Sequence, residues 1–335
     1  MVYAIWCWMR NHLHHKVENR NVLIIFQQVY GDSVLLVPLL KGFVELYHRA
    51  LGYRVTLLCR PSISKFLSEV ASIPEELIIE TMDYSRFLYD FCYFKDVVAH
   101  YRYSSGVSIV TGTSISAEIL SCTICSHKRY GLISGVQRTH PRIMVLFQQI
   151  AYTNPIIADV GVSHIMQKKL LMRRLGLNNY KGRLTRLLPQ ERVISGNYCV
   201  VCPGASVSVK MWPIDRFVSV IEYILGKYDM DVYLCGGVGE EYLGELIVSS
   251  VSFPERVHNK IGGTTFKEWA SIIEYSAFVL GNDSASVHIG VAYQKRVICI
   301  NGLYEKDIMY PYQVDELESD EALPDVVSLD SMSCA

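Results

Sequence analysis

The sequence predicts an α/β protein made of two doubly wound domains that face each other across a cleft. The chain has 335 residues, half of them hydrophobic, which suits two globular domains of ordinary size. Short apolar runs alternate with helical patterns in both halves, and this alternation is typical of parallel sheets. A polar, basic stretch at 177–197 contains Gly182, Pro189 and Gly196, and we interpret it as the linker between the domains.

The first predicted domain covers residues 21–176. Apolar runs predict strands at 22–26, 54–59, 77–80 and 107–110, and helical patterns predict helices at 33–47, 63–70, 114–120 and 164–175. Pro38 falls inside the first helix and is expected to bend or distort it.

The second predicted domain covers residues 198–335. Strands are predicted at 198–202, 231–235, 278–280 and 296–300, and helices at 215–226, 240–249, 265–275 and 284–293. The tail after residue 315 is acidic and shows no clear final helix. Ligands of such domains are expected at the carboxyl ends of the strands.

Residues 1–20 form a separate amphipathic segment. Trp6 and Trp8 precede a cluster of basic and histidine residues, while the basic n-region and the cleavage site of a signal peptide are lacking. The pattern fits a helix at a membrane surface and fits a helix packed on the domain equally well. No apolar run reaches the roughly 18 residues that span a bilayer.

The net charge of −1 conceals a strong asymmetry between the two halves. Residues 1–195 hold 23 Lys+Arg against 13 Asp+Glu, whereas residues 196–335 hold 9 against 20. Such asymmetry suggests that the first half faces an anionic partner, although two solvated surfaces of different charge would also produce it.

The cysteines and the acidic pairs do not predict a metal site. The ten cysteines are scattered in a way that suits reduced, buried thiols in a cytosolic protein. Cys199 and Cys202 lie three apart on a strand, so they point to opposite faces, and Cys122 and Cys125 have no histidine partner at zinc-finger spacing. The single DxD, residues 229–231, precedes a strand and is interpreted as a turn.

The stretch 278–292 is the strongest candidate for a binding site. An apolar strand is followed by Gly281 and Asn282, which allow a turn, and then by Asp283 or Ser284, either of which can cap a helix. Small residues at 284–286 leave the first helical amides accessible, which suits phosphate. His288 lies one turn further on the same face. The alternative is a well-capped crossover helix with a core histidine.

Other loops also follow predicted strands. Gly31 and Asp32 follow the first strand, and residues 203–213 follow the strand at 198–202 with Ser206 and the mobile cation of Lys210. Residues 236–241 follow a third strand and begin like a dinucleotide fingerprint, but the position of the third glycine is a tyrosine. A nicotinamide enzyme is therefore not expected, and together these loops fit a diphosphate site better than a protein-binding face.

Three motifs carry a family resemblance. The patterns Gly-Asp-x5-Pro (31–38), Pro-Gly-Ala-Ser-x3-Lys-x-Trp-Pro (203–213) and Gly-Asn-Asp-Ser-x3-His (281–288) resemble glycosyltransferase family 9, the bacterial heptosyltransferases of lipopolysaccharide core assembly. The resemblance runs from about residue 21 to 312. It implies the GT-B fold of two Rossmann-like domains, an N-terminal acceptor domain and a C-terminal domain that binds a nucleotide-sugar, ADP-heptose in the best-known members. It also implies inversion at the anomeric carbon without a metal or cofactor.

The resemblance assigns roles to individual residues. Asp32 matches the proposed general base and Lys210 the phosphate-binding lysine, while Glu240 is preferred over Glu241 as the acid that binds the donor ribose. The remaining donor-binding candidates are Ser206, Asp283, Ser284, Ala285 and His288. Two segments depart from the family pattern: 284–285 is Ser-Ala in place of Thr-Gly, and 300–303 replaces Phe-Gly-Pro-Thr. These departures bear on the identity of the donor sugar.

The resemblance therefore implies a metal-independent inverting glycosyltransferase that moves heptose to a lipid-linked glycan acceptor. Two alternatives stay open: a GT-B relative that acts on a nucleotide-sugar without an acceptor, as an epimerase does, and a non-catalytic nucleotide-sugar-binding protein. No nucleic-acid partner is implied. The expected location is cytoplasmic, peripheral on the anionic surface of the inner membrane. The basic candidates for that contact are Arg129, Arg138, Arg142, Lys168, Lys169, Arg173 and Arg174.

Overall fold

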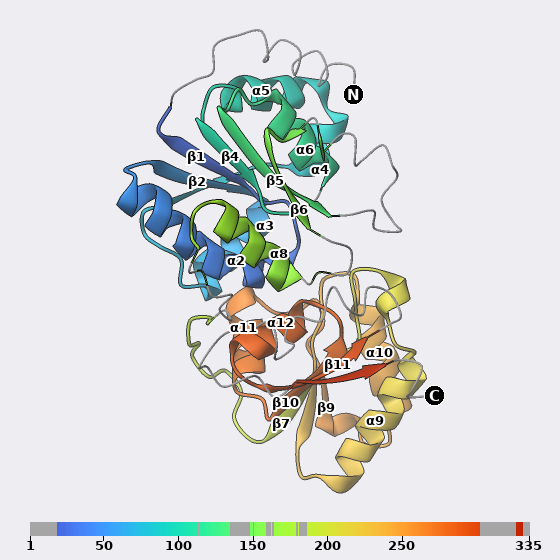
Figure 1. Ribbon diagram of the computed structural model, residues 1–335. Helices are drawn as coiled ribbons and strands as arrows, with labels where there is room; N and C mark the ends of the chain where they lie inside the picture. The colour runs from blue at the N-terminus through green and yellow to red at the C-terminus, as the bar shows by residue number, and fades with distance from the viewer. Residues whose placement is uncertain are drawn as a thin grey trace. The chain divides into compact units, whose positions relative to one another are not determined.

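The computed structural model divides into two compact units (Figure 1). The first unit contains Met1–Val29, Leu36–Leu67 and Ile73–Gly182, and the second contains Tyr30–Leu35, Ser68–Ser72 and Arg183–Ala335. The structure describes residues 19–112, 114–134, 148–149, 151–158, 162, 164–178, 180, 186–301 and 326–330. The predicted N-terminal segment, residues 1–20, lies almost entirely outside the described residues.

The first unit is built on a six-stranded parallel sheet in the order β3-β2-β1-β4-β5-β6. Its strands are β1 (Asn21–Ile25), β2 (Arg54–Cys59), β3 (Leu77–Thr81), β4 (Val107–Val110), β5 (Lys128–Ser134) and β6 (Asn154–Ala158). Its helices are α2 (Tyr30–Phe43), which continues as the π-helix η1 (Val44–Ala50), then α3 (Pro61–Val70), α4 (Tyr84–Tyr89), α5 (Phe91–Tyr101), α6 (Ile115–Thr123) and α8 (His164–Arg174).

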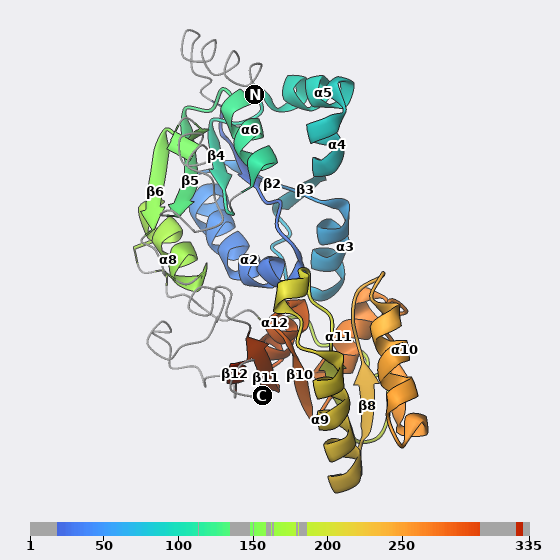
Figure 2. The ribbon, with the colours of Figure 1, turned by 90° about the vertical axis from the view of Figure 1, so that its right-hand side faces the viewer.

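The second unit repeats this arrangement with the order β12-β11-β10-β7-β8-β9. Its strands are β7 (Tyr198–Cys202), β8 (Asp231–Leu234), β9 (Val257–Asn259), β10 (Phe278–Asn282), β11 (Arg296–Asn301) and β12 (Val326–Asp330). Its helices are α9 (Ile214–Lys227), α10 (Glu241–Ser250), α11 (Phe266–Glu274) and α12 (Ala285–Ala292), with short 3₁₀ turns η2 (Ser208–Lys210) and η3 (Pro254–Arg256). Helix α9 packs against α10, and α11 packs against α12 (Figure 2).

Both sheets have the strand order of doubly wound domains, which confirms the predicted fold class. In each unit the first strand pairs with the fourth, β1 with β4 and β7 with β10, so the direction of winding reverses between them. The crevice at the carboxyl ends of these two strands is where open α/β sheets bind ligands.

All eight predicted strands exist, but several boundaries and elements were wrong. Gly281 and Asn282 are not in a turn: they are the last two residues of β10, because both pair with β11. The sequence patterns missed α4, α5, β5, β6, β9 and β12. Strand β6 begins Asn-Pro and lies at the edge of its sheet, where a proline without an N–H is tolerated, so its sequence did not look like a strand.

Each sheet buries its own apolar core. In the second unit, α9 contributes Phe217, Ile221, Ile224 and Leu225 to a cluster with the side chains of β7 and β8. In the first unit, residues of β1, β4, α4, α5 and α6 form a corresponding cluster. No helix in the described part of the chain is both long and apolar enough to cross a membrane.

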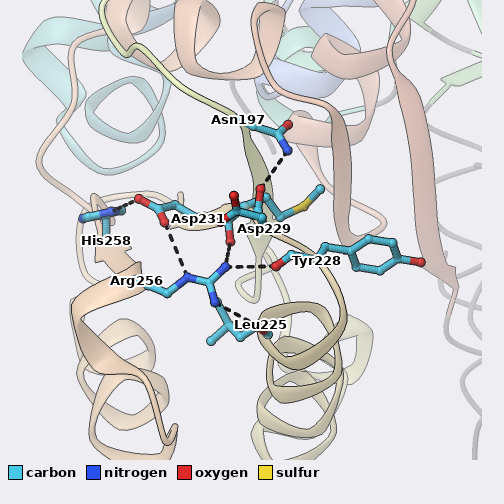
Figure 3. A network of polar contacts seen from close by, with 8 residues as sticks. Asn197, Leu225, Tyr228, Asp229, Asp231, Arg256 and His258 are labelled. Carbon is cyan, nitrogen blue, oxygen red and sulfur yellow. Dashed lines mark hydrogen bonds and ion pairs between the residues drawn. The ribbon is translucent and has the colours of Figure 1, made fainter.

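A polar network ties α9 to β8 and β9 (Figure 3). The Arg256 guanidinium donates hydrogen bonds to the backbone carbonyls of Leu225, Tyr228 and Met230 at 2.7–3.0 Å, which satisfies the end of α9. Asp231 lies 2.8 Å from His258 and 3.8 Å from Arg256. The second aspartate of the DxD is therefore held in a structural network at the amino end of β8, away from the strand ends that bind ligands.

Candidate functional site

The candidate site lies at the carboxyl ends of β7, β8 and β10 in the second unit. Parallel pairing places Gly281 of β10 opposite Cys202 of β7, so the loop after β7 and the helix after β10 begin side by side. A Cβ atom at Gly281 would lie 3.0 Å from both the Cβ and the carbonyl oxygen of Cys202. A side chain here would require Cys202 to move by a few tenths of an ångström, and a glycine avoids this.

Lys210 and Asp283 form an ion pair that joins the loop after β7 to the end of β10. The Lys210 Nζ lies 2.8 Å from Asp283 Oδ2, and the two side chains are only 10% and 8% exposed. Removing one partner of such a pair leaves an uncompensated charge in a poorly hydrated place. An ammonium has three N–H donors, and Asp283 accepts a hydrogen bond from one of them. The pair therefore fixes the position of the ammonium and leaves N–H donors for a ligand.

Helix α12 starts directly beyond this ion pair. Ser284 is its N-cap, with extended backbone (φ −147°, ψ 177°) and no capping hydrogen bond from its side chain. The predicted N-cap position is confirmed for Ser284, but its side chain does not form the capping bond, and the Asp283 carboxylate binds Lys210. Ser284 and Ala285 are half-buried and His288 is 4% exposed. The positive end of the helix dipole thus lies beside the Lys210 ammonium, an arrangement that favours an anion.

Glu240 links the loop after β8 to the loop after β7. Its Oε2 accepts a hydrogen bond of 2.8 Å from the Gly237 amide. A Cβ atom at Gly236 would lie 2.8 Å from this carboxylate, and one at Gly204 would overlap it. Glu241 instead accepts a hydrogen bond from the Gly239 amide. Of the two glutamates, Glu240 is the one that contacts the loop carrying Lys210.

The other two predicted residues are placed differently. Ser206 is exposed in the loop after β7. Asp32 lies in the first turn of α2, half-buried, in the helix that follows β1. The N-cap of that helix is Val29, so Asp32 is not its N-cap residue.

Sequence reasoning missed Asn282, which is fully buried. Its Nδ2 donates to the Pro203 carbonyl at 2.8 Å, and its Oδ1 accepts from the Trp212 amide at 3.0 Å. Trp212 packs edge-on against Phe217 of α9, with ring centroids 5.2 Å apart. In the sequence, Asn282 follows an apolar strand, and this position was interpreted as part of a turn.

The predicted basic surface is only partly present. Arg129, Lys168 and Lys169 are 4–5% exposed, so their side chains do not present charge to a membrane. Arg129 donates to the Ala151 carbonyl at 2.8 Å. Arg173 and Arg174 are exposed at the end of α8. The other candidates, Trp6, Trp8, Arg138 and Arg142, lie outside the described residues.

Two doubly wound units with phosphate-type loops at a strand-order reversal define the GT-B class of fold. A model of the family "Glycosyltransferase family 9 (heptosyltransferase)" matches residues 167–332, so the chain carries a domain of this family.

Solved structures share the fold, and a curated relative matches part of the chain. The glycosyltransferase family 9 structure from Veillonella parvula is similar at a TM-score of 0.71 and 14% identity, covering 93% of this chain and 87% of that one. The structure of E. coli heptosyltransferase WaaC with ADP is similar at a TM-score of 0.64 and 15% identity, covering 92% and 93%. At such identities these likenesses show the fold. Lipopolysaccharide heptosyltransferase 3 of Escherichia coli (strain K12) is 21% identical over 168 residues, or 47% of this chain. The match spans about half (49%) of the length of that relative.

Proposed function

We propose that the protein is a metal-independent, inverting glycosyltransferase that moves heptose from ADP-heptose to a lipopolysaccharide core or related lipid-linked glycan. The single observation that carries the proposal is the buried Lys210–Asp283 pair at the N-terminus of α12, next to the loop that Glu240 contacts. The cation and the helix amides suit the phosphates of a nucleoside diphosphate, and the Glu240 carboxylate suits its ribose hydroxyls. The ADP bound to the E. coli relative supports the choice of nucleotide.

In the proposed reaction, one residue acts on the acceptor hydroxyl and another group of residues acts on the donor diphosphate. Asp32 removes the proton of the acceptor hydroxyl as the hydroxyl oxygen attacks the anomeric carbon. The bond from that carbon to the diphosphate oxygen breaks on the opposite side, so the configuration inverts. Lys210 and the first amides of α12 stabilise the negative charge that gathers on the leaving diphosphate.

The other donor contacts are part of the same proposal. Glu240 binds the ribose hydroxyls through its carboxylate, and Ser206 reaches the phosphates from the exposed side of its loop. The donor sugar contacts Ser284, Ala285 and His288. The methyl group of Ala285 limits the space for the heptose. The protein acts at the cytoplasmic face of the inner membrane, where the lipid-linked acceptor is anchored.

A donor panel tests this function. Purified protein is incubated with ADP-heptose, other ADP-sugars, UDP-sugars and GDP-sugars, with and without a truncated lipopolysaccharide acceptor, and release of nucleoside diphosphate is measured. We expect release from ADP-heptose that requires the acceptor and that continues in EDTA. Turnover of donor without acceptor would support the epimerase-like alternative, and binding without any turnover would support the binding protein. Loss of activity in EDTA, restored by magnesium or manganese, would overturn the metal-free mechanism.

A further inference from the structure

Asn282 occupies a position from which one side chain holds both ends of the loop after β7. Pairing of Gly281 with Cys202 brings the next residue, Asn282, beside Pro203, the first residue of that loop. The carboxamide donates to the Pro203 carbonyl and accepts from the amide of Trp212, nine residues further along. Asn282 is 0% exposed, so the loss of either bond leaves a buried polar group without its partner.

The loop between these two bonds carries the cation of the candidate site. Lys210 ends the short turn η2, two residues before Trp212, and its ammonium binds Asp283, the residue after Asn282. Two consecutive residues therefore control the loop: Asn282 holds its backbone and Asp283 holds its lysine. If the backbone moved, the ammonium would lose its alignment with the start of α12.

We propose that Asn282 is a positioning residue that sets the affinity of the protein for the diphosphate of its donor by holding Lys210 in place through the loop. The proposal rests on the function proposed above, because it requires Lys210 to bind phosphate. A carboxamide donates through its NH₂ group and accepts through its oxygen, so one side chain satisfies both backbone groups. Leucine has nearly the same shape and no charge, so Asn282→Leu removes both bonds without adding electrostatic repulsion of the ligand.

The test compares a ligand that has the diphosphate with one that lacks it. Binding of ADP and of adenosine to the full-length protein is measured by isothermal titration calorimetry for the wild type and for Asn282→Leu. We expect ADP affinity to fall about tenfold or more, which corresponds to misalignment of one charge-assisted hydrogen bond, and adenosine affinity to stay within about twofold. A loss that is equal for both ligands would mean that Asn282 only supports the fold, and would overturn the proposal.

A double-mutant cycle tests whether Asn282 acts through Lys210. In a Lys210→Ala background, Asn282→Leu should cause no further loss of ADP affinity, whereas a positioning role independent of Lys210 would give additive losses and refute the proposal. Tyr198→Phe is the matched control, because it removes a buried hydrogen bond to the Ile272 carbonyl in the same unit but away from the loop. It should leave ADP affinity unchanged.

Two further measurements keep the outcomes separate. Thermal unfolding and circular dichroism establish that each variant is folded. If Asn282→Leu does not fold, Asn282→Ser, whose hydroxyl retains one of the two bonds, is measured instead and should show a smaller selective loss for ADP. A wild-type protein that binds neither ADP nor adenosine would refute the proposed nucleotide function, and this inference with it, before any variant is examined.

Discussion

Glu118 provides a quantitative test of how the first unit is stabilised. Its side chain lies in α6 at 0% exposure, where Gln148 Nε2 donates to Oε1 at 2.9 Å. The other oxygen, Oε2, has no hydrogen-bond partner among the described residues. Burial therefore raises the pKa of Glu118 from 4.5 to about 7, and the hydrogen bond from Gln148 opposes only part of that rise.

The raised pKa makes the stability of the unit depend on pH in a defined direction. Between pH 4.5 and pH 7 the folded protein holds a proton on Glu118 that the unfolded chain has released. The contribution of Glu118 to the unfolding free energy is therefore fully present below pH 4.5, falls as pH rises through this window and is absent above pH 7. A difference of 2.5 pKa units corresponds to about 3 kcal/mol of unfolding free energy. Glu118→Gln cannot ionise, so it should lack this contribution to the pH dependence.

The assay is urea unfolding of wild type and Glu118→Gln at pH 5, 6, 7 and 8. Because two domains need not unfold together, hydrogen exchange of peptides covering α6 and β4 assigns the change to the first unit. Relative to wild type, the variant should gain about 3 kcal/mol between pH 5 and pH 8. Exposed Glu75→Gln serves as the control and should show no such gain. A wild-type-to-variant difference that is the same at pH 5 and pH 8 would refute the reasoning.

Three further predictions concern the proposed function. Asp32→Asn should lower turnover roughly 10²- to 10⁴-fold and leave ADP affinity nearly unchanged in calorimetry; an equal loss of ADP binding would make the carboxylate structural. Lys210→Ala should weaken ADP binding roughly tenfold or more and lower turnover as well, and unchanged ADP affinity would remove this lysine from the site. Wild type should sediment with anionic liposomes at low salt and be released by high salt, and Arg173→Gln/Arg174→Gln should bind less, each charge being worth about 1 kcal/mol near an anionic surface. Indifference to anionic liposomes at low ionic strength would mean that the charge asymmetry only separates two solvated surfaces.

Local patterns predicted most of the strands because parallel strands buried on both faces are continuous apolar runs. Strands β2, β4 and β7 were predicted with the observed boundaries. Strand β5 was missed because it begins Lys-Arg and holds a glycine at its centre, which reads as a loop. A Cβ atom at Gly131 would overlap the Tyr152 ring, so this glycine serves close packing and not a turn.

Burial of charged residues could not be predicted from the sequence. The positive charges at Lys168 and Lys169 look like a solvated helix face, and their position in α8 places both side chains in buried surroundings. Charge counts describe a chain before it folds, whereas burial depends on what packs against each turn of the helix. The total charge of the first half therefore overstates the positive charge on its surface.

The loops of the candidate site could be predicted from the sequence, but the contacts between them could not. These contacts join residues that are far apart in the chain. Lys210 and Asp283 are 73 residues apart, and Asn282 and Trp212 are 70 apart. Both contacts depend on the pairing of β10 with β7, and a shift of one residue would turn Asn282 to the opposite face of the sheet. A Cβ atom at position 281 would lie 3.0 Å from Cys202, which is tighter than an ordinary contact, so a glycine suits this register. The bonds that hold the lysine loop thus depend on a strand register that joins distant parts of the chain, which is why motif matching found the loop and missed Asn282.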